Sequence, residues 1–196
     1  LQKETGMTFI HPYDDELVIA GQGTIGLEIL DQLPDVEAVV VPVGGGGLLA
    51  GVAFAIKSLR PDVKIYGVQA AGAASMYNAY RDHTYETLDH VDTFADGIAV
   101  KTPGETTFKM IEQYVDGIVT VSEDEIAAAI LALMENQKLV AEGAGATPVA
   151  AALFGKLPIE GKKTVCLISG GNIDVNILSR VITRGMIMSG RKTNLM

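Results

Sequence analysis

The feature that most constrains the fold is an apolar run that ends in four consecutive glycines. Residues 36–43 are mostly apolar and rich in valine, which is typical of a strand buried on both faces. Four glycines follow at residues 44–47. The apolar stretch 48–59 after them has the length of a helix and stops before Pro61. A strand, a glycine turn and a helix in this order indicate one unit of an α/β fold.

The same alternation continues along the rest of the chain. Further strands are predicted over residues 63–68, 117–121 and 163–168, and further helices over residues 14–33, 72–80, 104–114, 122–138 and 143–154. Ser122 and Glu125 have the spacing of a capping box at the start of one helix, and Asp14 and Asp15 suit the positive end of another. Residues 82–102 are polar and irregular, as expected of a functional loop. We predict an α/β protein with a mostly parallel twisted sheet and flanking helices.

Composition limits the partners that the chain can take. Its 196 residues are 48% hydrophobic, which is enough for one domain with a sizeable core. The net charge of −9 argues against nucleic acid and against an anionic membrane, because both attract basic surfaces. No apolar run is long enough for a membrane span. The single cysteine, Cys166, excludes an internal disulfide; it is interpreted as a core residue and favours a reducing, cytoplasmic compartment.

The glycine turn itself predicts an anion site. At Gly44, Gly45, Gly46 and Gly47 a turn exposes unpaired backbone N–H groups beside the positive end of the following helix, an arrangement that favours phosphate. Without Cβ atoms the backbone can wrap closely around the anion. A nucleotide loop of the Walker type is excluded because no Gly-Lys-Ser/Thr follows. A flexible turn without a ligand is the alternative interpretation.

A second glycine motif is interpreted as packing. Gly21-Gln22-Gly23-Thr24-Ile25-Gly26 matches the dinucleotide pattern GxGxxG, but that pattern requires a strand directly before it. Here the preceding residues belong to the predicted helix 14–33. We predict that these small residues allow close contact between helices, so a nicotinamide-dependent oxidoreductase is disfavoured.

Several polar residues near other glycines have two interpretations each. Ser169 follows the last predicted strand, where open α/β sheets bind ligands, and its hydroxyl can hydrogen-bond a ring nitrogen without protonating it. Alternatively this is a strand-ending turn with Asn172 as the next cap. Glu142 is either a functional acid or a charge at a helix start. Gly97 belongs to a turn by default, and His11, which precedes a proline, is interpreted as structural.

These motifs, taken in order, resemble the fold-type II pyridoxal-phosphate (PLP) enzymes, specifically threonine dehydratases and the related serine racemases. The segments that carry the resemblance are Phe9-Ile10-His11-Pro12-Tyr13-Asp14, Ile19-Ala20-Gly21-Gln22-Gly23-Thr24, Val41-Pro42-Val43-Gly44-Gly45-Gly46-Gly47-Leu48, Ala95-Asp96-Gly97, Val121-Ser122-Glu123-Asp124-Glu125-Ile126, Glu142-Gly143-Ala144-Gly145 and Ser169-Gly170-Gly171-Asn172. The resemblance implies that PLP is held by Gly44, Gly45, Gly46, Gly47 and Leu48 at its phosphate, by Ser169 at its pyridine nitrogen, and by Gly97 and Glu142 at the border of its ring.

The chain also departs from this family. The family's Schiff-base lysine lies in a Ser-x-Phe-Lys-x-Arg-Gly motif that is absent here, and Lys109, after a phenylalanine, is only a superficial echo. We therefore expect no catalytic residue in this chain, and expect the lysine motif and the substrate-carboxylate loop to lie upstream of Leu1. Residues 1–189 are interpreted as a partial catalytic domain, and residues 190–196 as the lead-in to a missing ACT-like regulatory domain. Gln69, Ala73 and Ser75 stand where racemases carry metal-binding carboxylates, so no metal is expected.

The resemblance implies an ammonia-lyase whose complete form deaminates L-threonine, and L-serine, by β-elimination to 2-oxobutanoate, or pyruvate, and ammonia. PLP is expected in the complete enzyme, whereas the chain alone is expected to be inactive. The alternatives are a non-catalytic binding or assembly module and a serine racemase-like enzyme. A partial α/β domain exposes a strand edge, so we expect a homo-oligomer or association with a complementary fragment.

Overall fold

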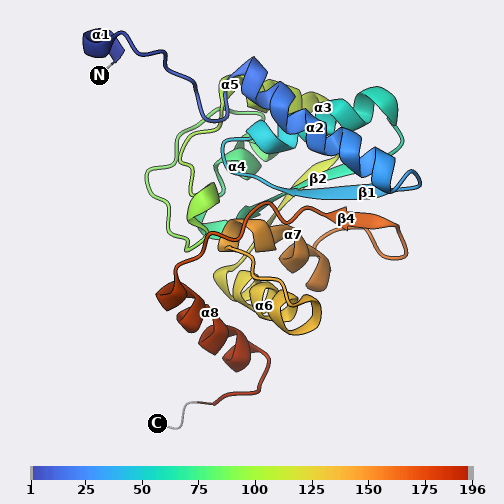
Figure 1. Ribbon diagram of the computed structural model, residues 1–196, viewed down its shortest axis with the longest axis vertical. Coiled ribbons are helices and arrows are strands. Elements are labelled where there is room, and N and C mark those ends of the chain that lie inside the picture. Colours follow the sequence, from blue (N-terminus) through green and yellow to red (C-terminus); the bar gives the residue numbers. More distant parts are fainter. Residues whose placement is uncertain (1, 194–196) are drawn as a thin grey trace.

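The computed structural model describes residues 2–193 and has a four-stranded sheet at its centre. The strands are β1 (Ala38–Pro42), β2 (Lys64–Ala70), β3 (Gly117–Val121) and β4 (Thr164–Cys166). Their order in the sheet is β3-β2-β1-β4, and each neighbouring pair is parallel. Helices cover both faces of the sheet (Figure 1). The predicted α/β architecture with a parallel sheet is therefore confirmed.

Strand β1 is the centre of the core. All five of its residues are buried, and successive side chains of a strand point to opposite faces. Val39 and Val41 accordingly pack into one hydrophobic cluster, while Ala38 and Val40 pack into the other. Because both faces are covered, the strand sequence is continuously apolar rather than alternating, as the valine-rich run predicted.

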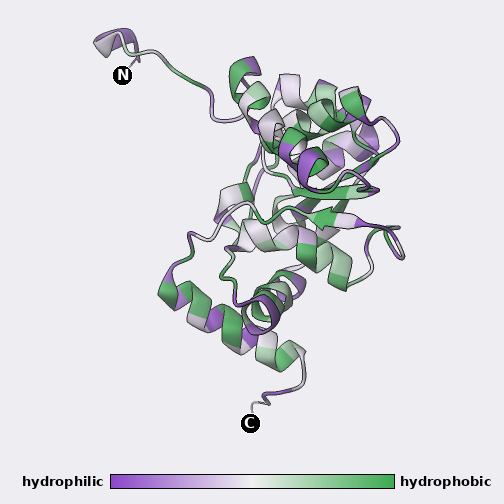
Figure 2. Cartoon of the chain, turned by 45° about the vertical axis from the view of Figure 1, so that its right-hand side comes forward, coloured by the Kyte–Doolittle hydropathy of each residue, from purple (hydrophilic) through white to green (hydrophobic). Residues whose placement is uncertain are grey.

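The helices form two layers. One layer consists of α2 (Glu16–Gln32), α3 (Gly47–Leu59), α4 (Ser75–Asp82) and α5 (Glu105–Tyr114), and the opposite face carries α6 (Glu123–Ala132), α7 (Gly143–Leu153) and α8 (Val175–Met188). Helix α8 packs on α6 rather than on the sheet, and its ribbon mixes hydrophilic and hydrophobic colours (Figure 2). The short α1 (Gln2–Thr5) lies away from the domain at the end of an extended segment (Figure 1). No helix within residues 2–193 is long and apolar enough to cross a membrane.

Helices α2 and α3 approach each other through glycines. A Cβ atom at Gly23 would lie 3.1 Å from the carbonyl oxygen of Gly51, and a Cβ atom at Gly51 would overlap the carbonyl oxygen of Ile19. Gly26 is equally restricted, since its Cβ would lie 3.0 Å from a carbonyl oxygen of α3. Gly21 has no atom within 4 Å of its Cβ position. The packing interpretation of the GxGxxG pattern is confirmed for its second and third glycines and is wrong for the first.

The predicted helix 72–80 begins only at Ser75, but the capping residues predicted for two other helices act as caps, with one difference. Asp15 caps α2, and Ser122 with Glu125 forms the predicted capping box of α6. The sequence places Asp14 at the start of α2 as well, but its carboxylate accepts hydrogen bonds from three consecutive N–H groups at the start of α5. The two adjacent aspartates therefore cap two different helices, a division that spacing along the chain cannot reveal.

The C-terminal third differs most from the prediction. The predicted strand 163–168 is shorter in the structure and spans Thr164–Cys166; among residues 2–193 it pairs with β1 alone. The predicted helix 122–138 ends in a π-helical turn over Leu133–Gln137. Helix α8 was not predicted, although Asp174 is its N-cap and the apolar periodicity after it was available in the sequence. Residues 194–196 of the predicted regulatory lead-in lie outside the described residues.

Candidate functional site

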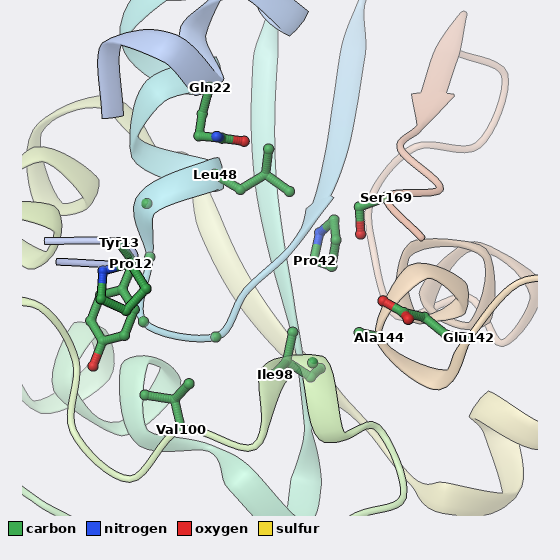
Figure 3. A pocket seen from close by; sticks show the side chains of 15 residues that line it. Pro12, Tyr13, Gln22, Pro42, Leu48, Ile98, Val100, Glu142, Ala144 and Ser169 are labelled. Carbon is green, nitrogen blue, oxygen red and sulfur yellow. The ribbon is translucent and has the colours of Figure 1, made fainter. Parts of the chain in front are cut away.

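A cavity of about 320 Å³ lies beside the carboxyl ends of β1 and β4 (Figure 3). Its lining includes every residue that the sequence singled out for a cofactor: Gly44, Gly45, Gly46, Gly47, Leu48, Gly97, Glu142 and Ser169. These residues come from segments that are widely separated in the sequence. The parallel sheet brings them together because the carboxyl ends of its strands meet at one edge.

The carbonyl groups of Gly44, Gly45 and Gly46 are bound by the protein. The hydrogen bonds are Gln69 Nε2 to Gly44 O at 3.4 Å, Gly104 N to Gly45 O at 3.1 Å, Thr107 Oγ1 to Gly45 O at 2.6 Å, and Ala50 N to Gly46 O at 2.8 Å. Each donor lies in the body of the domain. The turn is therefore held from behind, by its carbonyl oxygens.

The N–H groups of the same turn are free. Those of Gly44, Gly45 and Gly46 have no acceptor in the described part of the chain, and those of Gly47 and Leu48 belong to the first turn of α3, where no intrahelical acceptor exists. With its carbonyls engaged, the turn offers the cavity hydrogen-bond donors at the positive end of a helix. This arrangement suits an anion, and phosphate in particular.

Three glycines of the turn, Gly45, Gly46 and Gly47, cannot be replaced without a clash; a Cβ at Gly47 would lie 2.9 Å from the carbonyl oxygen of Tyr13. A Cβ atom at Gly45 would overlap the ring of Tyr13. Gly46 has a φ of 101°, in the left-handed region that favours glycine, and its Cβ would lie 2.7 Å from Met76 Cε. The glycines thus allow the backbone to lie against the protein on one side while its N–H groups face the cavity on the other.

Glu142 forms part of the opposite wall. It is the N-cap residue of α7, yet its carboxylate makes no capping hydrogen bond and points into the cavity (Figure 3). The side chain fits against two glycines, because a Cβ at Gly97 would lie 3.3 Å from Glu142 Oε1 and a Cβ at Gly170 would overlap the carboxylate. Its backbone N–H donates to Gly170 O at 3.0 Å. Glu142 therefore stands at a helix start, as one of its two interpretations predicted, but its carboxylate does not cap the helix and remains available to the cavity.

Ser169 lies next to Glu142 on this side of the cavity, across from the glycine turn (Figure 3). The residue is exposed, and its hydroxyl has no hydrogen-bond partner among residues 2–193. The alternative role suggested for this turn, with Asn172 as the cap of the next helix, is not observed because Asp174 caps α8. The Ser169 hydroxyl is free to bind a polar group that enters the cavity.

Tyr13, Gln69, Thr107 and Glu123 support the cavity and were not predicted. Tyr13 packs on the turn and donates to Thr102 O at 3.2 Å; burial, and then the nearby Tyr85 and Asp14, raise the pKa of its phenol, which keeps it neutral. Glu123 accepts hydrogen bonds from Thr93 Oγ1 at 2.6 Å and from Phe94 N at 3.0 Å, which fixes the segment that leads to Gly97. Tyr13 and Glu123 lie within two of the family motifs, which was the available signal for them. The sequence marks Gln69 only as a lost metal ligand, and nothing local marks Thr107.

The remaining sequence candidates lie outside the cavity lining. His11 Nδ1 accepts the Asp14 N–H at 2.8 Å, which is the structural role predicted for it. Lys109 is exposed and pairs with Glu105 at 2.8 Å. No lysine is among the residues that line the cavity. Within residues 2–193 no group of three or more His, Cys, Asp or Glu side chains is placed to hold a metal ion.

Comparison with known proteins agrees with this geometry. The model of the pyridoxal-phosphate dependent enzyme family matches residues 1–171. L-threonine ammonia-lyase of Thermotoga maritima is 57% identical over 192 residues, which cover 98% of this chain and 48% of that protein. The processed form of threonine deaminase isoform 2 from Solanum lycopersicum matches with a TM-score of 0.88 at 42% identity, over 93% of this chain and 54% of that one. Serine racemase from Dictyostelium discoideum matches with a TM-score of 0.82 at 37% identity, and the match covers 89% of this chain and 56% of that one.

The fold and the cavity therefore define an α/β protein of the fold-type II kind, with a glycine turn of free N–H groups at the carboxyl end of its central strand. The chain belongs to the pyridoxal-phosphate dependent enzyme family. Its first curated relatives are L-threonine ammonia-lyases, and the chain spans about half the length of these relatives.

Proposed function

We propose that this chain forms the phosphate-binding and ring-binding part of the cofactor site of an L-threonine ammonia-lyase. The observation that carries the proposal is the glycine turn, whose carbonyl oxygens are bound by the protein while its N–H groups are free. Ser169 and Glu142 stand across the same cavity. The relatives with this name are more than 50% identical to the chain, as in Thermotoga maritima and Geobacter sulfurreducens at 57% and 51%.

The residues fit the chemical groups of PLP. The N–H groups of residues 44–48 would hold the phosphate, because they supply several donors at a helix N-terminus. The Ser169 hydroxyl would hydrogen-bond the pyridine nitrogen and leave it without a full positive charge. Gly97 and Glu142 would border the ring, since Gly97 has no side chain to obstruct a flat ligand. When bound, PLP supplies an electron sink for negative charge at the α-carbon of an amino acid.

A serine partner for the ring nitrogen suits β-elimination. L-threonine would lose its α-proton and its β-hydroxyl, and hydrolysis of the product would give 2-oxobutanoate and ammonia. L-serine would give pyruvate in the same way. A weakly polarised ring is sufficient because the departing hydroxyl carries away the electron pair, so a deep electron sink is not required. This chain's contribution is to hold and orient the reacting groups.

We further propose that the chain alone does not turn over threonine. The cavity lining contains no lysine, and the family's Ser-x-Phe-Lys-x-Arg-Gly motif is absent from the sequence. The general base that removes the α-proton would therefore come from elsewhere in the complete enzyme. Production of 2-oxobutanoate from L-threonine by the purified 196-residue chain, at a rate above that of buffer with free PLP, would refute this part of the proposal.

Cofactor binding is tested by titration of the purified chain with PLP and, separately, with pyridoxal, which lacks the phosphate. We expect PLP to bind measurably more tightly than pyridoxal, because the free N–H groups act on the phosphate. Ser169→Ala should weaken both ligands to a similar degree, since the hydroxyl acts on the ring that they share. Equal affinity of the wild-type chain for PLP and pyridoxal would contradict the assignment of the glycine turn.

The open side of β4 supports a proposal about partners. Within residues 2–193 this strand pairs with β1 on one side only, and the residues of β4 are half-buried rather than fully covered. We propose that the edge is covered in solution, by a second copy or by a complementary piece of the enzyme. Sedimentation velocity over a range of concentrations tests this for the chain alone. A monomer at all concentrations would exclude the second copy.

A further inference from the structure

We infer that Thr107 and Asp14 are positioning residues that hold the peptide group after Gly45, and so aim an N–H group of the turn at the cavity. The inference rests on the proposed function, because the ligand of that N–H group is the proposed phosphate. Neither residue lines the cavity. Each acts through the backbone of another segment.

The peptide group between Gly45 and Gly46 is held through its carbonyl oxygen. The carbonyl of Gly45 and the N–H of Gly46 belong to the same planar unit and point in opposite directions. Gly45 O accepts hydrogen bonds from Thr107 Oγ1 at 2.6 Å and from Gly104 N at 3.1 Å. Fixing this oxygen against the domain therefore fixes the direction of the Gly46 N–H. Glycine has the least resistance to rotation of this peptide, so the two bonds are what restrain it.

The Thr107 hydroxyl that binds Gly45 O is buried in the domain. The side chain of Thr107 is fully buried, and its hydroxyl also lies 3.2 Å from the carbonyl oxygen of Gly104. A hydroxyl has one proton, so the shorter contact, to Gly45 O, is the stronger hydrogen bond. A buried hydroxyl that serves the glycine turn is costly to replace by an apolar group, because the carbonyl loses a partner.

Asp14 caps helix α5, whose own N-cap residue has no side chain. Gly104 is the N-cap residue of α5, where a capping side chain is usual, but a Cβ there would lie 2.5 Å from both Asp14 Oδ1 and Thr107 Oγ1. The position must be glycine for its N–H to reach Gly45 O. Asp14 therefore supplies the missing cap from a distant segment, and accepts the N–H groups of Glu105, Thr106 and Thr107 at 3.0, 2.9 and 3.1 Å.

Asp14 lies between two residues that also touch this region. The ring of Tyr13 packs on Gly45, and the carboxylate of Asp15 caps α2. The segment 13–15 therefore connects α2, α5 and the glycine turn. Loss of the Asp14 carboxylate would loosen the start of α5, and with it the two donors to Gly45 O. Because the same change also removes a negative charge near the proposed phosphate, Thr107 gives the cleaner test.

The test compares Thr107→Val with Thr147→Val in the full chain. Thr147 is the matched control, since it is also fully buried but its hydroxyl bonds only the carbonyl of Ala144 within its own helix, at 2.9 Å. Thr107→Val should weaken PLP binding by about fivefold to tenfold, the effect of one hydrogen bond, and leave pyridoxal binding unchanged. Thr107→Ser should restore PLP binding. Thr147→Val should leave the ratio of the two affinities as in the wild type.

A second readout does not depend on any ligand. In ¹H–¹⁵N spectra of the free chain, the amide resonance of Gly46 should move in Thr107→Val and Asp14→Asn, and stay in place in Thr147→Val. Failure of the wild-type chain to bind PLP would count against the proposed function, while the Gly46 resonance would still test the inference. An unmoved Gly46 resonance, or an unchanged ratio of PLP to pyridoxal affinity in Thr107→Val when the wild type binds, would overturn it.

Discussion

The ring of Tyr13 occupies the space in which a side chain at Gly45 would lie. The glycine and the aromatic ring are therefore two sides of one contact, and the turn lies against the segment that precedes α2. This contact explains why the motif before α2 and the glycine turn belong together in one site. The contact requires both residues, because the Tyr13 ring fills the space that a side chain at position 45 would need.

Gly45→Ala is predicted to destabilise the chain and to weaken PLP binding. The added methyl overlaps the Tyr13 ring, and overpacking of this kind costs about 1–3 kcal/mol of unfolding free energy. Urea unfolding and PLP titration measure the two effects. In the double variant Gly45→Ala/Tyr13→Ala the clash is absent, so the stability losses should not add. Strict additivity of the two single changes would show that the contact is not the cause.

Replacing a glycine of α2 and a glycine of α3 by alanine is predicted to change the free energy of unfolding in opposite directions. Gly21→Ala should raise the free energy of unfolding by about 0.5–1 kcal/mol, because the Cβ position is open and alanine favours a helix. Gly51→Ala should lower it by about 1–3 kcal/mol or more, because the methyl overlaps the Ile19 carbonyl. Urea unfolding of both variants measures the difference. A stabilised Gly51→Ala variant would contradict the close helix contact.

The sequence predicted the structural features that are determined by residues adjacent in the chain. The buried strand β1, the glycine turn and the capping box of Ser122 and Glu125 all have local signals, and the structure places them as expected. The ordered family motifs also predicted which residues meet in the cavity. The sequence could not show that Asp14 caps α5 or that Thr107 bonds Gly45, because these partners lie far apart in the chain. Such long-range contacts are set by packing, which leaves no periodic signal.

Asp116 is predicted to contribute to stability in a pH-dependent way. Its carboxylate contacts Lys57 Nζ and Lys64 Nζ at 2.8 Å each and accepts the N–H of Ile65 at 2.9 Å. Burial alone would raise its pKa, but the hydrogen bonds from the two lysines outweigh burial and hold the pKa below its usual range. Because the folded pKa is lower than the unfolded value of about 3.9, the stabilisation is present above that pH and is lost as the pH falls through the folded pKa.

Asp116→Asn should therefore lower the unfolding free energy by about 1–3 kcal/mol at pH 7 and flatten its decline below pH ~4. Asp62→Asn is the control, because Asp62 is exposed and pairs with Arg60 on the surface, where ion pairs contribute little. Urea unfolding between neutral and acidic pH measures both variants. An Asp116→Asn curve that runs parallel to the wild type at all pH values would contradict the prediction.

Cys166 is predicted to be a slow nucleophile. Burial raises the pKa of its thiol to about 11, and the sulfur lies 3.7 Å from the Pro148 carbonyl oxygen. At pH 8 about one thiol in a thousand would be ionised, against roughly one in four for a free cysteine, and only the thiolate reacts. The rate of alkylation by iodoacetamide, followed by intact mass, should rise about tenfold per pH unit until the pH approaches the folded pKa of about 11, and then level off. In the urea-unfolded chain it should level off near the ordinary thiol pKa of about 8.5. If burial only restricted access of the reagent, the folded chain would react more slowly at every pH, but its rate would level off at the same pH as in the unfolded chain. A plateau of the folded chain near pH ~8.5 would therefore show that burial does not raise the pKa of the thiol.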